Sequence, residues 1–353
     1  MEVFAEIKGI KYTPFLCRSL DKYNIAQIDK ALSERASFIL EVNRRNEVAV
    51  SWWVSPKRTR SYPYARVYDT LNFAGRKVTI IPVIKDEGKD GDRDFLQWDT
   101  ISLMSLLGVY AIIAYYVDAD KNPRYANKIT NQRFDIGYIR DEIKRLLSYQ
   151  SDALHWNLEQ IDKIPKTAEL ALNAYRSISK KLEVEMHSME SAWRRIDELR
   201  KGKERFMELS RELAYKAQIR ESMTTQPKEY LAGVKAIITI KNYLGGYYYF
   251  TCDEVEVHQD ELYLIEGKHT KTGVLPSEGD IKDGLIKMIL FTNLENVLAD
   301  GHKFKPIPIL KLTTDNEFNT SLLNSSKKQF LDLLKKEAEI NGFRIKINDT
   351  FFV

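Results

Sequence analysis

Cysteine is scarce in this 353-residue chain, which contains only Cys17 and Cys252, far apart in the sequence. Two distant cysteines argue against a disulfide framework and against a zinc site, and they are typical of a protein of the reducing cytoplasm. The five histidines show no metal-ligand spacing. No Gly-x-x-x-x-Gly-Lys phosphate loop occurs, so the sequence indicates no nucleotide cofactor.

Long apolar runs are also missing. The uncharged run 101–117 has 17 residues, just short of a membrane span, and contains serines, tyrosines and a glycine. We therefore expect a helix leading into a buried strand there, and no membrane partner. The first residues, Met-Glu-Val-Phe-Ala-Glu, carry acid where a secretion signal carries base, which favours a cytoplasmic protein. Because the net charge is only +4, any nucleic-acid surface must come from local clustering of basic residues.

The segment 247–271 has the pattern of a β-hairpin. Residues 247–257 are rich in aromatic and β-branched side chains, residues 262–265 are apolar, and a short polar stretch separates them. If Gln259 and Asp260 form the turn, counting outward from that pair places Asp253 opposite Glu266. Alternation then gathers both acids and Lys268 on one face, beside four aliphatic side chains, those of Val255, Val257, Leu262 and Leu264.

Two carboxylates beside an apolar surface cannot comfortably both stay ionised, and a divalent cation relieves that repulsion. Magnesium binds proteins through one or two carboxylates and keeps waters and phosphate oxygens as its other ligands. A lysine on the same face can sit near a metal-bound water or a scissile phosphate. The pattern therefore predicts a site for metal-assisted hydrolysis of phosphodiester bonds.

Asp253, followed after twelve residues by Glu266-Gly267-Lys268, resembles the signature of PD-(D/E)xK nucleases, on the hairpin where that superfamily carries it. The run 265–269 with a polar turn and a helix after it looks most like type II restriction endonucleases. The resemblance covers roughly the last third of the chain, and Cys252 stands where many members have proline. It implies Mg²⁺ held by Asp253, Glu266 and the backbone carbonyl of Gly267, with Lys268 positioning or activating the attacking water.

The same resemblance implies a homodimer that cuts both strands of specific duplex DNA and leaves 5′-phosphates. Replacing Asp253 or Glu266 is expected to abolish cutting while leaving the fold nearly intact. Two other interpretations stay open: a repair or recombination nuclease of the same superfamily, or a non-catalytic DNA-binding or scaffold protein.

The acid-x-Lys pattern is common and occurs five times in this chain. Glu142 and Asp280 lie in helical patterns, Glu6 has no strand before it, and the nearest acid upstream of Glu87 would not face it. Only Glu266 has an opposed aspartate, an aliphatic face and a strand end. The alternative for this segment is an ordinary hairpin with a salt bridge.

The pattern of elements predicts an α/β fold, with a mixed β-sheet core flanked by helices over residues 226–353. An N-terminal α/β domain is expected over residues 1–130, including a helix over 25–41, and a long helical arm or linker over 131–225. In the last domain we expect an amphipathic helix over 280–294. Glu229, on a short helix before the hairpin, is interpreted as a surface charge or a further acid near the metal.

Two loops are candidates for DNA contact. Residues 55–66 are basic and aromatic without an acid, which suits phosphates and base edges, although a solvated loop is the alternative. Residues 85–94 are dense in charge; they lack the glycine and glutamate of a calcium loop and suggest a solvated turn or a DNA contact. The candidate DNA-binding residues, including two beside the hairpin, are Lys57, Arg58, Arg60, Tyr62, Tyr64, Arg66, Lys89, Arg93, His269 and Lys271.

Overall fold

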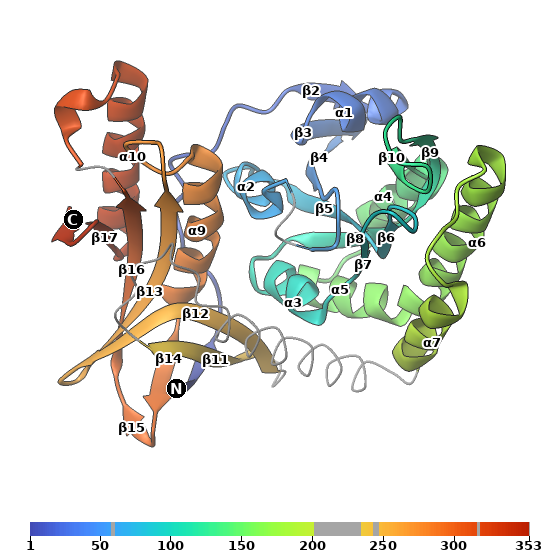
Figure 1. Cartoon of the computed structure of the whole chain (residues 1–353). Helices are drawn as coiled ribbons and strands as arrows, with labels where there is room; N and C mark the ends of the chain where they lie inside the picture. The colour runs from blue at the N-terminus through green and yellow to red at the C-terminus, as the bar shows by residue number, and fades with distance from the viewer. Residues whose placement is uncertain (58–60, 201–233, 243–246, 316–317, 353) are drawn as a thin grey trace. The chain divides into compact units, whose positions relative to one another are not determined.

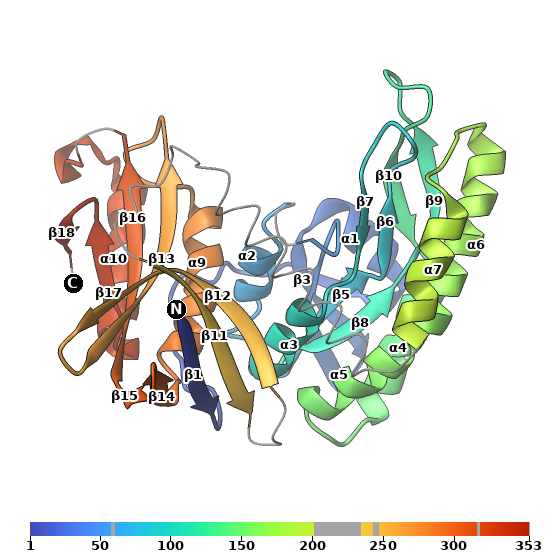
Figure 2. The same cartoon turned by 60° about the horizontal axis from the view of Figure 1, so that its bottom comes forward.

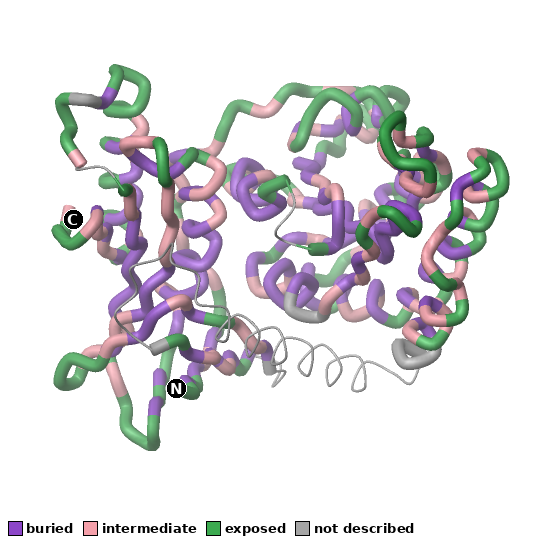
Figure 3. Tube along the Cα trace, in the orientation of Figure 1, coloured by how far each residue is buried: buried purple, intermediate pink, exposed green. Residues whose placement is uncertain are grey.

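The computed structural model describes residues 1–57, 61–200, 234–242, 247–315 and 318–352 (Figure 1). The chain forms two compact units. The first combines Met1–Ser19 with Ala217–Val353, and the second is Leu20–Lys216. The predicted α/β class is confirmed, since each unit holds a sheet with helices packed against it. Figure 3 shows that the buried residues follow the strands of each sheet.

The first unit is built on a nine-stranded mixed sheet (Figure 2). The strands, in spatial order, are β15 (His302–Lys303), β14 (Glu295–Ala299), β1 (Glu2–Ile7), β11 (Val234–Asn242), β12 (Tyr247–His258), β13 (Glu261–Thr270), β16 (Lys305–Thr314), β17 (Arg344–Ile347) and β18 (Thr350–Phe351). Strands β11, β12 and β13 are antiparallel, and β16 runs parallel to β13. Helix α9 (Glu278–Phe291) packs on β13 and β16, and α10 (Ser325–Asn341) packs on β17.

The predicted hairpin is confirmed, and so is its register. Glu254 pairs with Ile265 and His258 with Glu261, which leaves Gln259 and Asp260 as the turn. Gln259 has φ 53°, the left-handed conformation that tight hairpin turns require. The predicted burial is only partly correct, because Val257 is 47% exposed near the turn whereas Glu254 and Ile265, on the opposite face, are buried.

Residues 1–19 do not belong to an N-terminal domain, contrary to the three-domain expectation. Strand β1 runs parallel to β11 and antiparallel to β14, so it completes the sheet of the C-terminal unit. The segment after it is fixed to α10, where the buried Glu337 accepts hydrogen bonds from Tyr12 Oη (2.6 Å) and the Phe15 amide (2.8 Å). The second unit is therefore inserted between the first two strands of the first.

The second unit has a five-stranded sheet in the order β2 (Lys22–Asn24), β3 (Ser37–Asn43), β4 (Asn46–Trp52), β5 (Arg76–Pro82) and β8 (Tyr110–Ala114). Its other strands are β6 (Ile84–Asp86), β7 (Arg93–Phe95), β9 (Tyr116–Lys121) and β10 (Ile129–Phe134). Its helices are α1 (Ile28–Glu34), α2 (Pro63–Tyr68), α3 (Trp98–Leu106), α4 (Ile136–Ser148), α5 (Ala153–Asp162), α6 (Ile164–Leu182) and α7 (Met189–Arg200).

Two helical predictions need correction. The helix expected over residues 25–41 ends at Glu34, because residues from Ser37 onward pair with β4. The expected helical arm is not a separate domain: α6 packs on β9, and the buried Tyr175 donates a hydrogen bond to Gln132 Oε1 of β10 (2.7 Å). None of the described helices is long and apolar enough to cross a membrane.

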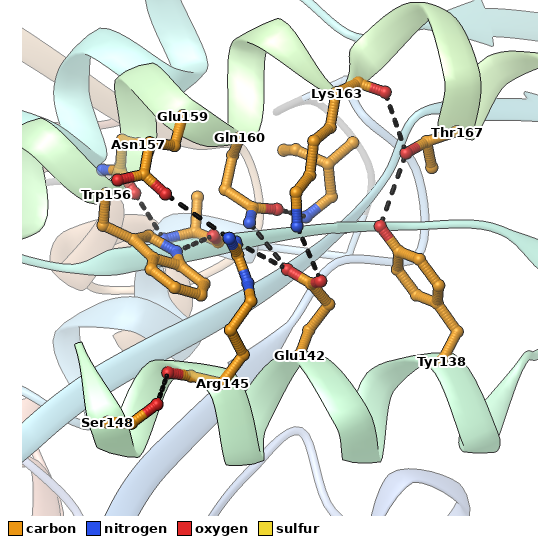
Figure 4. Close-up of polar contacts among 12 residues, drawn as sticks. Tyr138, Glu142, Arg145, Ser148, Trp156, Asn157, Glu159, Gln160, Lys163 and Thr167 are labelled. Carbon is orange, nitrogen blue, oxygen red and sulfur yellow. Dashed lines mark hydrogen bonds and ion pairs between the residues drawn. The ribbon is translucent and has the colours of Figure 1, made fainter.

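Side chains of helix α5 form hydrogen bonds with the backbone of β8, the edge strand of the second sheet, as a further strand would (Figure 4). Asn157 Oδ1 accepts from the Ala111 amide (2.7 Å), Gln160 Oε1 accepts from the Ile113 amide (3.2 Å), and Trp156 Nε1 donates to the Ala111 carbonyl (2.7 Å). An edge strand left open would present these groups for pairing with another chain. The three side chains therefore protect the free edge of β8.

Glu142, one of the acids in an acid-x-Lys pattern, belongs to the same structural cluster (Figure 4). Its carboxylate accepts hydrogen bonds from Lys163 Nζ (2.8 Å), Gln160 Nε2 (2.8 Å) and Arg145 Nη2 (3.0 Å). These bonds join α4 to α5 and to Lys163, which lies between α5 and α6. Glu142 therefore has a structural role.

Candidate active site

Asp253, Glu266 and Lys268 come together in the first unit, as the hairpin register requires. Asp253 lies on β12, and its Oδ2 accepts a hydrogen bond from the amide of Gly267 on β13 (3.1 Å). The two carboxylates are close enough for each to shift the pKa of the other. Lys268 Nζ lies 3.1 Å from Glu266 Oε1. Glu266 is 1% exposed, whereas the side chain of Asp253 is 23% exposed, so the cluster opens to solvent on the Asp253 side.

An irregularity in β12 helps to place Asp253. Cys252 pairs with Ala236 and Val255 pairs with Val234, so β12 has one residue more than β11 between these pairs, at positions 253 and 254. Such β-bulges bend the strand and redirect a side chain, and they are common beside active sites. The hairpin was predicted from regular alternation of side chains, which does not include a bulge.

Helix α9 adds two charged residues that the sequence interpretation did not identify, Asp283 and Lys287. Lys287 Nζ lies 2.5 Å from Glu266 Oε2 and 3.9 Å from Asp253 Oδ1, and the residue is 4% exposed. Asp283 Oδ2 lies 2.8 Å from Lys268 Nζ. The signal for them was their spacing of four residues, which places both side chains on one side of a helix that follows the motif.

The charges of the cluster set the protonation of its members. Burial would raise the pKa of Asp253, but the charges of Lys287 and Lys268 and the hydrogen bond from the Gly267 amide hold it well below its usual value. Burial and the neighbouring Asp253 raise the pKa of Glu266. Burial would lower the pKa of Lys268, yet Glu266 and Asp283 raise it above its ordinary value. Lys268 is therefore an ammonium that can donate hydrogen bonds and cannot accept a proton from water.

Gly284 allows α9 to approach the motif closely. A Cβ atom at this position would lie 2.7 Å from Leu310 Cδ1 and 3.1 Å from Lys268 Cε. Real Cβ atoms do not approach another carbon to 2.7 Å, so a larger residue would push the helix or these side chains away. The glycine sits one residue after Asp283, and it lets the helix deliver both of its charged residues to the strands.

Some of the candidate DNA-binding residues at 55–66 make contacts within the second unit. Arg66 lies in α2, packs 4.6 Å from the ring centroid of Trp52 and donates to the Trp52 carbonyl (2.9 Å). Tyr64 is buried against Trp53. Tyr62 is 50% exposed, and the exposed Lys57 pairs with Asp94 (2.7 Å). The predicted loop is thus partly helical. Three residues that the sequence interpretation singled out, Arg58, Arg60 and Glu229, lie outside the described residues.

Only part of the charge-dense segment 85–94 is a solvated turn, one of the two expectations for it: residues 89, 90 and 92 are exposed. The other expectation, contact with DNA, stays a prediction. Residues 85–88 are buried, and Glu87 lies 2.8 Å from Lys85 Nζ and 3.3 Å from Lys128 Nζ. Lys89 pairs with Glu185 (2.8 Å), while Arg93 donates to the carbonyl of Ser188 (2.9 Å). Charged residues are buried here because strands β6 and β7 and the neighbouring loops supply a partner for each of them.

The two candidates beside the hairpin lie in different surroundings. His269 is largely covered, with Nδ1 3.0 Å from Thr313 Oγ1, whereas Lys271 is exposed. No family model matches this sequence, and no curated protein or solved structure matches it either. The functional argument for this chain therefore depends on its own residues and geometry.

Proposed function

We propose that the protein is a Mg²⁺-dependent endodeoxyribonuclease of the type II restriction kind, which hydrolyses phosphodiester bonds in specific duplex DNA and leaves 5′-phosphates. The observation that carries the proposal is the joint placement of Asp253, Glu266 and Lys268. They lie on adjacent antiparallel strands, in the register expected for the PD-(D/E)xK signature, with a helix and a parallel strand following. Other acid-x-Lys pairs of the chain have structural partners instead, as at Glu142 and Glu87.

The residues present fit a magnesium ion. No group of three His, Cys, Asp or Glu side chains converges among the described residues. Magnesium does not require one, because it binds through one or two carboxylates and retains waters. Asp253, Glu266 and the carbonyl of Gly267 would hold the ion. When bound there, Mg²⁺ supplies a Lewis acid for a phosphate oxygen and makes a coordinated water more acidic.

The chain's own residues orient the substrate around that site. Lys268, held as an ammonium between Glu266 and Asp283, is placed to donate hydrogen bonds to the attacking water or to an oxygen of the scissile phosphate. It stabilises negative charge that develops during the reaction, and it does not remove the proton. Asp283 keeps the ammonium in place.

A homodimer would bring one such site to each strand of the duplex, so we propose that the protein acts as a homodimer in the cytoplasm. Cys17 and Cys252 form no disulfide in the described part of the chain, which is compatible with a reducing compartment. Lys57, Tyr62, Lys89 and Lys271 remain the best candidates for DNA contact among the described residues, since their side chains are exposed.

The experiment is digestion of plasmid DNA and of a defined linear duplex, with and without Mg²⁺. We compare the parent with Asp253→Asn, Glu266→Gln and Lys268→Met. Loss of either carboxylate should abolish cutting, and loss of the lysine should slow it by about 10²-fold or more. Glu256→Gln is the matched control, because Glu256 lies on β12, like Asp253, and its carboxylate pairs with His258 (3.0 Å). Cutting by Glu266→Gln at the rate of the parent would disprove the assignment.

A further inference from the structure

Lys287 occupies a position that the proposed nuclease mechanism does not explain. It is almost completely buried, and its ammonium contacts the same carboxylate pair that is proposed to hold magnesium. It lies 2.5 Å from Glu266 Oε2, while Lys268 takes the other oxygen of Glu266 at 3.1 Å. Both oxygens of Glu266 are therefore already bound by ammonium groups.

An ammonium and a metal ion compete for these oxygens, because both are cations and repel each other at short range. Magnesium binds oxygen at about 2.0–2.1 Å and requires lone pairs directed at it. Lys287 directs its donors at Glu266 Oε2, and its charge lies 3.9 Å from Asp253 Oδ1. A divalent cation held by Asp253 and Glu266 would therefore be close to the Lys287 ammonium and would be repelled by it.

The local charge supports the same conclusion. Asp253, Glu266 and Asp283 carry three negative charges when ionised, and Lys268 and Lys287 carry two positive charges. The net charge is thus −1 with Lys287 in the cluster and −2 without it, so a divalent ion neutralises the cluster only when the Lys287 ammonium has left. Because Glu266 is 1% exposed, solvent screens an unbalanced charge there poorly.

We propose that Lys287 is an internal counter-ion, which holds the carboxylate pair together in the metal-free protein and must leave it before a divalent cation binds. The inference rests on the proposed function, because it concerns the same carboxylates. Lys287 thereby weakens metal binding in the free protein and makes occupancy depend on whatever stabilises the displaced ammonium. A DNA phosphate is the chemical group suited to that, so loading of the site would be coupled to substrate.

The test is binding of Mn²⁺ to the DNA-free protein, measured from the electron paramagnetic resonance signal of the unbound ion. Lys287→Met removes the charge and keeps the length of the side chain, and Lys287→Gln is a second neutral variant. Lys287→Arg keeps the charge, and Lys335→Met is a control at a lysine of α10 whose side chain is 47% exposed. We expect the neutral variants to bind Mn²⁺ about ten-fold more tightly than the parent, and the other two variants to resemble the parent.

A second measurement uses the parent alone, so it does not depend on a variant that folds. Acetylation of Lys287 by acetic anhydride, mapped by mass spectrometry, should increase when Mn²⁺ is added, because the displaced ammonium becomes accessible. Lys282, which is 2% exposed on the same helix, should not change. Equal Mn²⁺ affinity of parent and neutral variants, or unchanged labelling, overturns the inference alone. Absence of Mn²⁺ binding in every protein overturns the metal site of the proposed function as well.

Discussion

Glu266 is the residue whose surroundings differ most from the sequence expectation. The pair of acids suggested electrostatic repulsion that mutation would relieve, so replacing Glu266 was expected to leave the fold nearly intact. The structure places Lys287 and Lys268 on its two oxygens at 2.5 and 3.1 Å. Removing the acid would leave Lys287 buried with Asp253 as its nearest carboxylate in this cluster, at 3.9 Å.

We therefore predict that Glu266→Ala lowers the free energy of unfolding by about 3–5 kcal/mol, the usual cost of breaking a buried ion pair from one side. Asp253→Ala should cost less, because that side chain is 23% exposed and more distant from Lys287. Urea unfolding followed by circular dichroism measures both. Glu256→Ala is the control and should change stability by less than about 1 kcal/mol. A Glu266→Ala protein as stable as the parent would show that the two lysines do not need this acid.

Residue roles could be predicted from the sequence where spacing along one hairpin was enough. Asp253, Glu266 and Lys268 follow from alternation and a turn, because neighbouring strands fix which side chains meet. Asp283 and Lys287 could not be placed in this way. The helix expected to be amphipathic over 280–294 is α9, and it is buried on almost every side from Gly284 to Phe291. A helix without a polar face gives no indication of which side meets the sheet.

At the scale of elements, local patterns were reliable where the pairing partner was close in sequence. The β12–β13 hairpin is one such case, since two turn residues connect its strands. The helix expected over residues 25–41 failed because β3 is stabilised by pairing with β2 and β4 and not by its own periodicity. The bulge at residues 253 and 254 is defined by pairing with β11, so the sequence pattern of β12 alone could not predict it.

Contact between α9 and the hairpin gives a prediction at the same scale. Gly284→Ala should destabilise the first unit by about 1–3 kcal/mol, because the added methyl group would collide with Leu310 and Lys268. It should also slow DNA cutting, since Lys268 must shift. Urea unfolding and plasmid cutting measure the two effects. Gly9→Ala is the control, as a Cβ there meets no atom within 4 Å. Equal effects of both substitutions would show that close approach of α9 is not required.

At the scale of the whole molecule, the chain order hides the division into units. Residues 1–19 belong with 217–353, and nearly two hundred residues of the second unit are inserted between β1 and β11. The sequence patterns did not identify β1 as a strand of the C-terminal sheet, because its partner β11 lies beyond the whole inserted unit. Parallel pairing such as that of β1 with β11 always needs a long connection, so its register cannot be derived from a turn.

The insertion makes the candidate site at Asp253 and Glu266 depend on the first residues of the chain. Strand β1 lies between β11 and β14 and buries Val3, whereas its neighbour Phe4 is 48% exposed. Val3→Asp should place an unpaired carboxylate in the core, which costs several kcal/mol and is comparable with the total stability of a domain. We expect this variant to lose both the cooperative unfolding of the first unit and the cutting of plasmid DNA. Phe4→Asp should unfold and cut like the parent, because its side chain reaches solvent. Normal stability and cutting by Val3→Asp would show that β1 is dispensable for the unit that holds Asp253 and Glu266.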